Sequence, residues 1–239
     1  MKKIIRPILD LIYPPGCQQC GEIGKNGDYL CPCCFDSAKR IEHPFCDVCS
    51  EPFEGEIHSQ FTCPNCHNLE FTFSRARSAL YNTDANRQLV LDFKYGKQIH
   101  LAKVLGAFCA ELIEHDPIFS SLPKPALVPV PLHKRRKFQR TFNQADVLSR
   151  VITQLSGIPT AKLLKRKIYT TTQTRLTREQ RLKNLKNAFA ATSSKNEFRS
   201  AIIVDDVFTT GSTSEACAAM LKKEYPNIEN IVVLTALRG

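Results

Sequence analysis

The chain has 239 residues, of which 43% are hydrophobic and 23% are charged, and its formal net charge is +10. These values are typical of a globular protein with one sizeable core and a smaller second module, and they exclude an intrinsically disordered chain. The apolar stretches have the length of strands and fall far short of the ~20 residues that a membrane helix needs, so we expect no membrane span.

The opening residues 2–15, KKIIRPILDLIYPP, are too short and too interrupted for a secretory signal. They favour a short amphipathic helix that caps the module following it. Without an export signal we expect a cytoplasmic protein, in which cysteine serves metal binding rather than disulfide formation.

Four C-x-x-C pairs come next in the chain, CQQC at 17–20, CPCC at 31–34, CDVC at 46–49 and CPNC at 63–66. Two such pairs supply the four sulfurs of a tetrahedral zinc site, and a zinc with four sulfurs is structural because no position remains for water or substrate. The spacing alone leaves an interleaved pairing open. Pairing in sequence order predicts one zinc at Cys17, Cys20, Cys31 and Cys34 and a second at Cys46, Cys49, Cys63 and Cys66.

A module of this size with few large apolar side chains needs such a metal, because its own core would be marginal. Residues 1–70 are therefore predicted to form a zinc-binding module, and their 6 basic and 10 acidic residues argue against binding of a phosphate backbone by the module itself. Cys33 is set aside because the two-residue gap favours Cys31 with Cys34. We expect His43, His58 and His67 at the surface.

Beyond residue 70 the pattern changes to alternating strands and helices. This order implies an α/β domain at 71–239, with a parallel sheet covered by helices on both faces. Gly157 is expected to end a helix, and Cys109 and Cys217 fall on apolar helical positions that belong in a core. The expected strands are 71–81, 126–131, 201–207 and 231–237, and the expected helices are 84–96, 100–116, 143–157, 177–189 and 212–224.

Positive charge is concentrated in residues 133–187, which contain 15 Lys and Arg but only Asp146 and Glu179 as acids. A charge run of this kind is ordinarily a solvated surface. Together with the phosphate motif that follows, it favours a polyanionic partner or ligand.

The segment IIVDDVFTTGST at 202–213 combines two carboxylates with a loop of hydroxyls around one glycine. At a strand-to-helix turn the free backbone N–H groups suit a phosphate, and Gly211 permits its close approach. Asp205 and Asp206 would repel that phosphate, so they are expected to bind sugar hydroxyls or a hydrated Mg(II). A phosphorylated ribose that carries a pyrophosphate combines all these features. The hydroxyl donors are Thr209, Thr210, Ser212 and Thr213.

The stretch VDDVFTTGST resembles the phosphoribosyl pyrophosphate motif of type I phosphoribosyltransferases. Together with the cysteine pairs, VPVPLHKRRKFQRTFNQAD and QTRLTREQRLKNLKNAF, nearly the whole chain resembles the ComF family (ComFC and GntX proteins). The resemblance implies a type I phosphoribosyltransferase-like fold, with Asp205 and Asp206 on the ribose hydroxyls and residues 209–213 around the 5′-phosphate. One departure is Thr141, where the family usually has glycine before FNQ.

The resemblance also implies a diphosphate-facing loop after the VPVP strand and a hood at 170–181 that closes over the site with Arg175 and Arg181. In the loop we favour Arg140, which adjoins the FNQ match, as a catalytic residue beside the two aspartates. Asn143 and Gln144 either belong to this loop or cap the following helix. The other loop candidates are Lys134, Arg135 and Arg136.

Three functions follow from these patterns. An enzyme would transfer a phosphoribosyl group, with Mg(II), to an acceptor that the sequence does not identify, and the resemblance places it in single-stranded DNA uptake and handling during natural transformation. A non-catalytic module would bind single-stranded DNA through residues 133–187, with Phe138, Phe142 and Tyr169 as stacking platforms. A docking module would bind another competence protein, such as a DNA helicase. A sheet with a vestigial loop and no ligand is the remaining alternative.

Overall fold

The computed structural model describes residues 16–23, 29–57, 60–133, 141–168, 185, 187–193 and 197–239. The expected helix at 2–15 and the expected hood at 170–181 lie outside these ranges. So do His58, Lys134, Arg135, Arg136, Phe138, Arg140 and Tyr169.

A four-stranded parallel sheet forms the centre of the molecule, in the order β1 (Arg75–Leu80), β6 (Asn230–Arg238), β5 (Ser200–Phe208) and β2 (Pro125–Pro129). Strands β5 and β6 lie in the middle of the sheet and are buried along almost their whole length. Such continuous burial is typical of a parallel sheet with both faces covered. The expected strand at 71–81 is shorter in the structure, and its burial does not alternate, because β1 is also covered on both faces.

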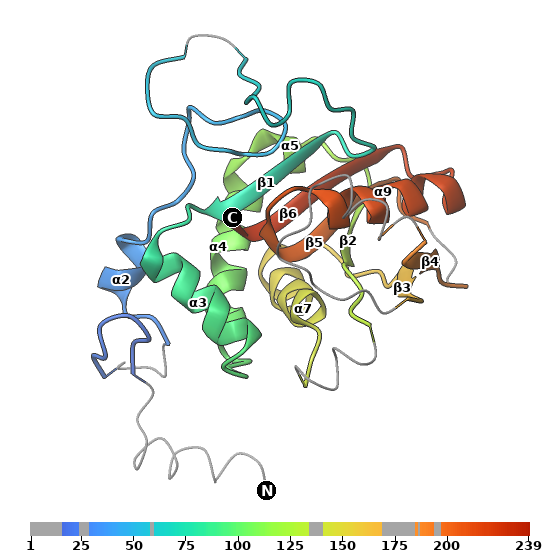
Figure 1. The fold of residues 1–239 in the computed structure, drawn as a ribbon. Coiled ribbons are helices and arrows are strands. Elements are labelled where there is room, and N and C mark those ends of the chain that lie inside the picture. Colours follow the sequence, from blue (N-terminus) through green and yellow to red (C-terminus); the bar gives the residue numbers. More distant parts are fainter. Residues whose placement is uncertain are drawn as a thin grey trace, which may run out of the picture.

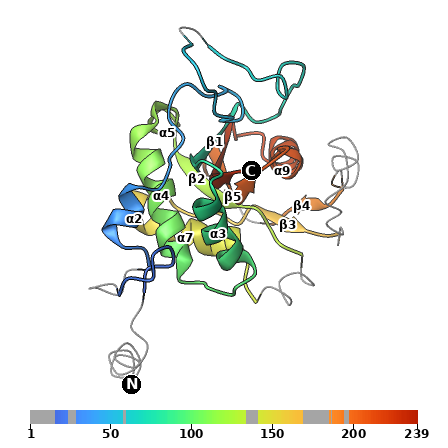
Figure 2. The ribbon, with the colours of Figure 1, turned by 60° about the vertical axis from the view of Figure 1, so that its left-hand side comes forward.

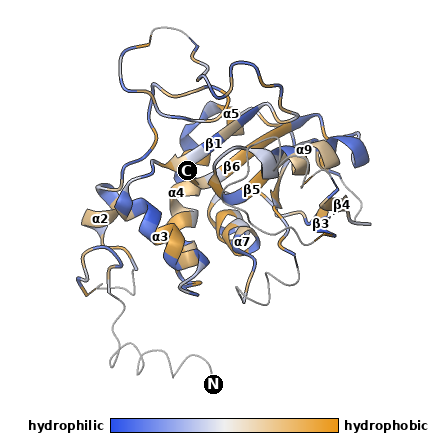
Figure 3. Ribbon diagram, viewed as in Figure 1, coloured by the Kyte–Doolittle hydropathy of each residue, from blue (hydrophilic) through white to orange (hydrophobic). Residues whose placement is uncertain are grey.

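Helices cover both faces of the sheet (Figures 1 and 2). Ile202 and Val204 of β5 share a core with α3 (Asp84–Lys94), α4 (Leu101–His115), the short α5 (Pro117–Ser120) and α7 (Gln144–Ser156). Ile203, on the alternate face, shares a second core with α9 (Ser212–Glu224). The helices α3 and α9 carry both hydrophilic and hydrophobic residues (Figure 3). The α/β expectation is therefore confirmed, and Cys109 and Cys217 are buried in these cores.

A two-stranded antiparallel sheet, β3 (Leu164–Arg166) with β4 (Phe189–Ala191), packs near α9 and was not predicted. The helix expected at 177–189 is wrong at its end, because Phe189 lies in β4. Phe189 and Leu164 are buried in the same core as Leu221 of α9, so tertiary packing decides the conformation here rather than helical periodicity.

The cysteine-rich segment has little regular structure apart from the short helix α2 (Pro32–Asp36). Its two halves lie apart, the first beside α3 and the second above β1 (Figure 1). Cys17 and Cys31 belong to the core under α3 and α4, whereas Cys46 and Cys63 belong to the core under α9. The segment is thus built onto the α/β core at two places. Among the described helices, none is long and apolar enough to cross a membrane.

Candidate functional site

The two aspartates lie inside strand β5 rather than at its end. Asp205 pairs in register with Thr235 and Phe208 pairs with Arg238, so the strand continues past the expected boundary at 207 and the turn begins at Thr209. Successive side chains of a strand leave opposite faces. Asp205 and Asp206 therefore meet different neighbours at the carboxyl edge of the sheet.

Asp206 is paired with a lysine that the sequence analysis did not identify. Its Oδ1 lies 2.9 Å from Nζ of Lys94, in the last turn of α3, and Asp206 is only 7% exposed. A pair so far removed from water is strongly coupled, because either charge alone would be costly. Lys94 was missed because the ion pair joins positions far apart in the chain, while a lysine near a helix end has no distinctive local pattern.

Asp205 faces the side of the sheet that α9 covers. Its Oδ1 accepts a hydrogen bond of 2.9 Å from the backbone N–H of Asp206. Burial, and secondly the negative charge of Asp206, raises the pKa of Asp205 to about 7, although the positive charges of Lys94 and Arg166 act in the opposite direction. Near neutral pH this carboxyl group therefore lies between its protonated and its ionised form, and a cation or a hydroxyl donor beside it would favour the ionised form.

The turn after β5 presents unpaired backbone donors. Within the described part of the chain, none of the backbone N–H groups of residues 209–213 donates a hydrogen bond. Gly211 is the N-cap of α9, and no side chain caps that helix, so its first N–H groups lack a side-chain acceptor, as suits an anion site. The hydroxyls of Thr210 and Ser212 lie 2.9 Å apart and add donors to the same turn.

Gly211 is required at its position for two reasons. Its φ of 73° lies in the left-handed region that favours glycine. A Cβ at this position would also lie 2.8 Å from the ring of Phe208 and 3.1 Å from the ring of Phe71. The conformation of the turn therefore depends on this glycine.

The segment that leads into α7 contacts the chain just after β2 and the end of α3. Thr141 has a φ of 68°, a conformation that suits glycine and strains a β-branched residue. Asn143 occupies the N-cap position of α7, but its side chain donates to the carbonyl of Val130 at 3.1 Å instead of capping the helix. Gln144 is buried and donates to the carbonyl of Lys94 at 3.5 Å, which connects the start of α7 to the end of α3.

Eight cysteines form two clusters, and the structure selects the sequential pairing over the interleaved one that the spacing had left open. The Sγ atoms of each cluster lie within 4.8 Å of one another, and the pairs Cys20 with Cys31 and Cys49 with Cys63 lie 3.7 Å apart. A tetrahedral zinc with sulfurs at 2.3 Å requires a spacing of about 3.8 Å, so both clusters fit zinc. The second cluster is fully buried, and Cys33 is exposed and belongs to neither. His43 and His67 are exposed, as expected. The clusters are Cys17, Cys20, Cys31 and Cys34, and Cys46, Cys49, Cys63 and Cys66.

A pocket of about 510 Å³ lies between the β3–β4 sheet and α9, away from the acidic pair. Its cationic side chains are Lys165 of β3, Lys167 just after β3, and Lys223 of α9. The carboxylate of Glu224 also lines the pocket and lies 3.5 Å from Nζ of Lys223, and Met220 and Phe189 are apolar. The side chain of Arg166 is not part of this lining, and its charge acts on Asp205 instead.

Comparison with known proteins gives results for both halves of the chain. The family model of the double zinc ribbon domain matches residues 8–68. Competence protein F of Haemophilus influenzae is 34% identical over 84% of this chain and 86% of its own, and DNA utilization protein YhgH of Escherichia coli is 29% identical over 80% and 83%. Among solved structures, adenine phosphoribosyltransferase from Leishmania tarentolae matches 62% of this chain and 74% of its own, with 14% identity and a TM-score of 0.34.

Proposed function

The chain belongs to the ComF family of competence proteins, and from this premise we propose that it binds phosphoribosyl pyrophosphate with Mg(II) at the turn after β5 and acts in the handling of single-stranded DNA during uptake. We divide the chain into a zinc-binding module, residues 1–70, and a phosphoribosyltransferase-like domain, residues 71–239. Two clusters of reduced cysteines fit a reducing compartment, so we place the protein in the cytoplasm.

One observation carries the proposal: open backbone donors and two carboxylates lie on the same short segment at the carboxyl edge of a parallel sheet. Ligands of open α/β sheets bind at this edge. The N–H groups of residues 209–213 would bind the 5′-phosphate, and the carboxylate of Asp205 would accept hydrogen bonds from the ribose hydroxyls. Asp206 would bind a ribose hydroxyl on the side of the sheet that faces α3, where Lys94 now neutralises its carboxylate.

The donor set also fits Mg(II), because carboxylate, hydroxyl and phosphate oxygens are the ligands that this ion prefers. When bound, Mg(II) would supply positive charge to the diphosphate that leaves the sugar. The residues of the chain would fix the ribose between the turn and the two aspartates, and Asp205 would place negative charge beside a sugar that becomes cationic during transfer. Arg140 stays a proposed cation for the diphosphate, as do the neighbouring basic residues that lie outside the described ranges.

We propose that transfer goes to an acceptor yet to be identified. The test is the release of pyrophosphate from phosphoribosyl pyrophosphate and Mg(II), with single-stranded DNA added as one candidate acceptor. The double variant Asp205→Asn and Asp206→Asn should lose both binding and release, and Asp84→Asn, on an exposed residue of α3, serves as the matched control. Release that is equal in both variants would remove the acidic pair from the mechanism.

Binding of single-stranded DNA without catalysis is the second candidate, and the lysine-lined pocket beside β3 favours it. Lys165 and Lys167 line this pocket and offer contacts to a phosphate backbone, whereas Lys223 is already ion-paired with Glu224 in the same lining. The double variant Lys165→Glu and Lys167→Glu should weaken binding of an oligonucleotide and reduce its dependence on salt. An unchanged salt dependence would place the DNA elsewhere.

A further inference from the structure

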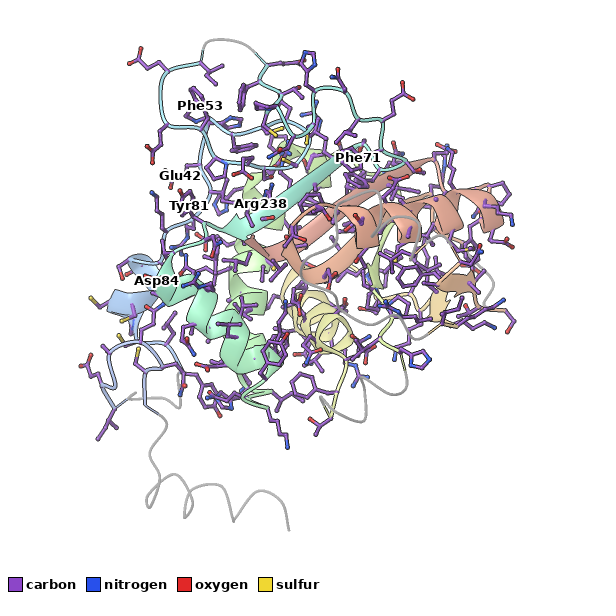
Figure 4. The ribbon with its side chains drawn as sticks, viewed as in Figure 1. Glu42, Phe53, Phe71, Tyr81, Asp84 and Arg238 are labelled. Carbon is purple, nitrogen blue, oxygen red and sulfur yellow. The ribbon has the colours of Figure 1, made fainter. Side chains whose placement is uncertain are left out.

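Arg238 lies near the end of β6 (Figure 4). It contacts both the second cysteine cluster and the turn after β5. The residue is only 6% exposed, which is rare for an arginine and requires partners for its charge. The hydrogen bonds of its guanidinium go in two directions, Nη2 toward the cysteine-rich segment and Nη1 toward the turn. Apart from the carbonyl of the adjacent Gly239, the partners of Arg238 are 29 to 189 residues away in the chain, so no local sequence pattern indicates this role.

On the cluster side, Nη2 lies 3.8 Å from Sγ of Cys49 and forms an ion pair with the carboxylate of Glu51. A zinc with four thiolate ligands has a net negative charge, and the second cluster is fully buried. A guanidinium beside one of its sulfurs compensates that charge where water cannot. Arg238 is therefore expected to stabilise the zinc-loaded form of Cys46, Cys49, Cys63 and Cys66.

On the turn side, Nη1 donates to the carbonyl of Phe208 at 2.9 Å and to the carbonyl of Thr209 at 3.2 Å. A trans peptide is planar, so each carbonyl points opposite to the N–H group of the next residue. Fixing these two carbonyls on Arg238 directs the N–H groups of Thr209 and Thr210 away from it. The carbonyl of Phe208 also accepts a hydrogen bond of 2.7 Å from the N–H group of Gly239, which fixes the same peptide further.

We propose that Arg238 is a positioning residue that couples the second zinc cluster to the phosphate-binding turn. Through this coupling, zinc in the second cluster raises the affinity of the turn for phosphoribosyl pyrophosphate. The zinc ligands are Cys46, Cys49, Cys63 and Cys66. The first cluster does not take part, because its cysteines pack under α3 and α4 rather than against Arg238. The inference rests on the proposed function for its ligand, but the connection from cluster to turn can be measured without that ligand.

Coupling of this kind is reciprocal. If zinc in the second cluster strengthens ligand binding, the ligand must raise the affinity of that cluster for zinc by the same factor. We expect the higher affinity to appear as slower release of the second zinc. The zinc of the first cluster should leave at the same rate with and without ligand. A general stabilisation of the fold would slow the release of both zincs. Slower release of the second zinc alone therefore distinguishes the coupling from such a stabilisation.

The experiment follows zinc release from the full, zinc-loaded chain into a chromogenic chelator, and alkylation of the freed cysteines identifies which cluster loses its metal. Loss of a partner of a metal ligand typically lowers metal affinity about tenfold or more. We therefore expect Arg238→Gln to release the second zinc about tenfold faster and to leave release of the first unchanged. The matched control is Arg199→Gln, which removes an exposed arginine with a carboxylate partner far from the turn. Phosphoribosyl pyrophosphate with Mg(II) should slow release of the second zinc in the wild type but not in Arg238→Gln.

The inference is overturned if Arg238→Gln and the Arg199→Gln control release the second zinc at the same rate. If the wild type binds no phosphoribosyl pyrophosphate, the proposed function fails, and hydrogen exchange decides the inference separately. Removal of the second zinc from the wild type should then speed exchange of the Gly239 amide, and an unchanged rate would overturn the coupling. This measurement needs no variant, so it stands even if Arg238→Gln fails to fold.

Discussion

Replacement of Gly211 by alanine tests the turn most sharply, because the structure separates two costs of the change. The first is conformational, since a residue with a Cβ at a φ of 73° loses roughly 1–2 kcal/mol. The second is steric, because the new Cβ would lie 2.8 Å from the Phe208 ring and 3.1 Å from the Phe71 ring. Overpacking of this kind costs about 1–3 kcal/mol.

Gly157 supplies the matched control. It has a φ of 75°, and a Cβ built there meets nothing within 4 Å, so Gly157→Ala carries the conformational cost alone. Replacing glycine by alanine also lowers the conformational entropy of the unfolded chain. This stabilising effect is common to both variants and cancels in their difference. We therefore expect Gly211→Ala to be less stable than Gly157→Ala by about 1–3 kcal/mol.

Urea unfolding of the zinc-loaded variants, followed by circular dichroism, measures this difference. Calorimetric titration with phosphoribosyl pyrophosphate and Mg(II) measures the effect on the site, and only Gly211→Ala should lose affinity. Equal stability and equal affinity of the two variants would refute the packing described around Gly211 and the role of the turn.

Two further predictions concern the acidic pair. Because the folded-state pKa of Asp205 is raised to about 7, its contribution to stability is present at low pH and is lost as pH rises from the unfolded value toward the folded one. Asp205→Asn should thus raise the urea midpoint more at pH 8 than at pH 5, and an equal change at both pH values would contradict the burial of this carboxyl. Lys94→Met leaves the buried Asp206 carboxylate without its cation and should cost about 3 kcal/mol in urea unfolding, whereas adding Asp206→Asn should restore most of that loss. If the second change restores nothing, the ion pair is not what stabilises this edge of the sheet.

The elements with strong local signals were predictable from the sequence. The helix expected at 212–224 has those bounds in α9, and Gly157 ends α7 in the left-handed conformation. The four C-x-x-C pairs also identified all eight cysteines of the two clusters, although the choice between sequential and interleaved pairing came from the structure. In each case the information lies within a few residues of the feature.

The features that were missed depend on contacts between distant parts of the chain. Strand β5 continues to Phe208 because Val207 and Phe208 pair with Leu237 and Arg238 of β6, which no local pattern shows. The β3–β4 sheet forms because Phe189 finds a buried position in the core beneath α9. Lys94 and Arg238 are ordinary basic residues in sequence and acquire their roles only where the fold brings Asp206 and Cys49 beside them.

The central claim is that the turn after β5 binds an anion while the adjacent aspartates bind its sugar. Calorimetric titration of the zinc-loaded protein with phosphoribosyl pyrophosphate and Mg(II), at two temperatures so that a small binding enthalpy is not overlooked, tests it directly. We predict one site per chain, lost in the Asp205→Asn and Asp206→Asn double variant and kept in Asp84→Asn. The absence of binding by the wild-type protein at both temperatures, or binding that survives the double substitution, would contradict the account.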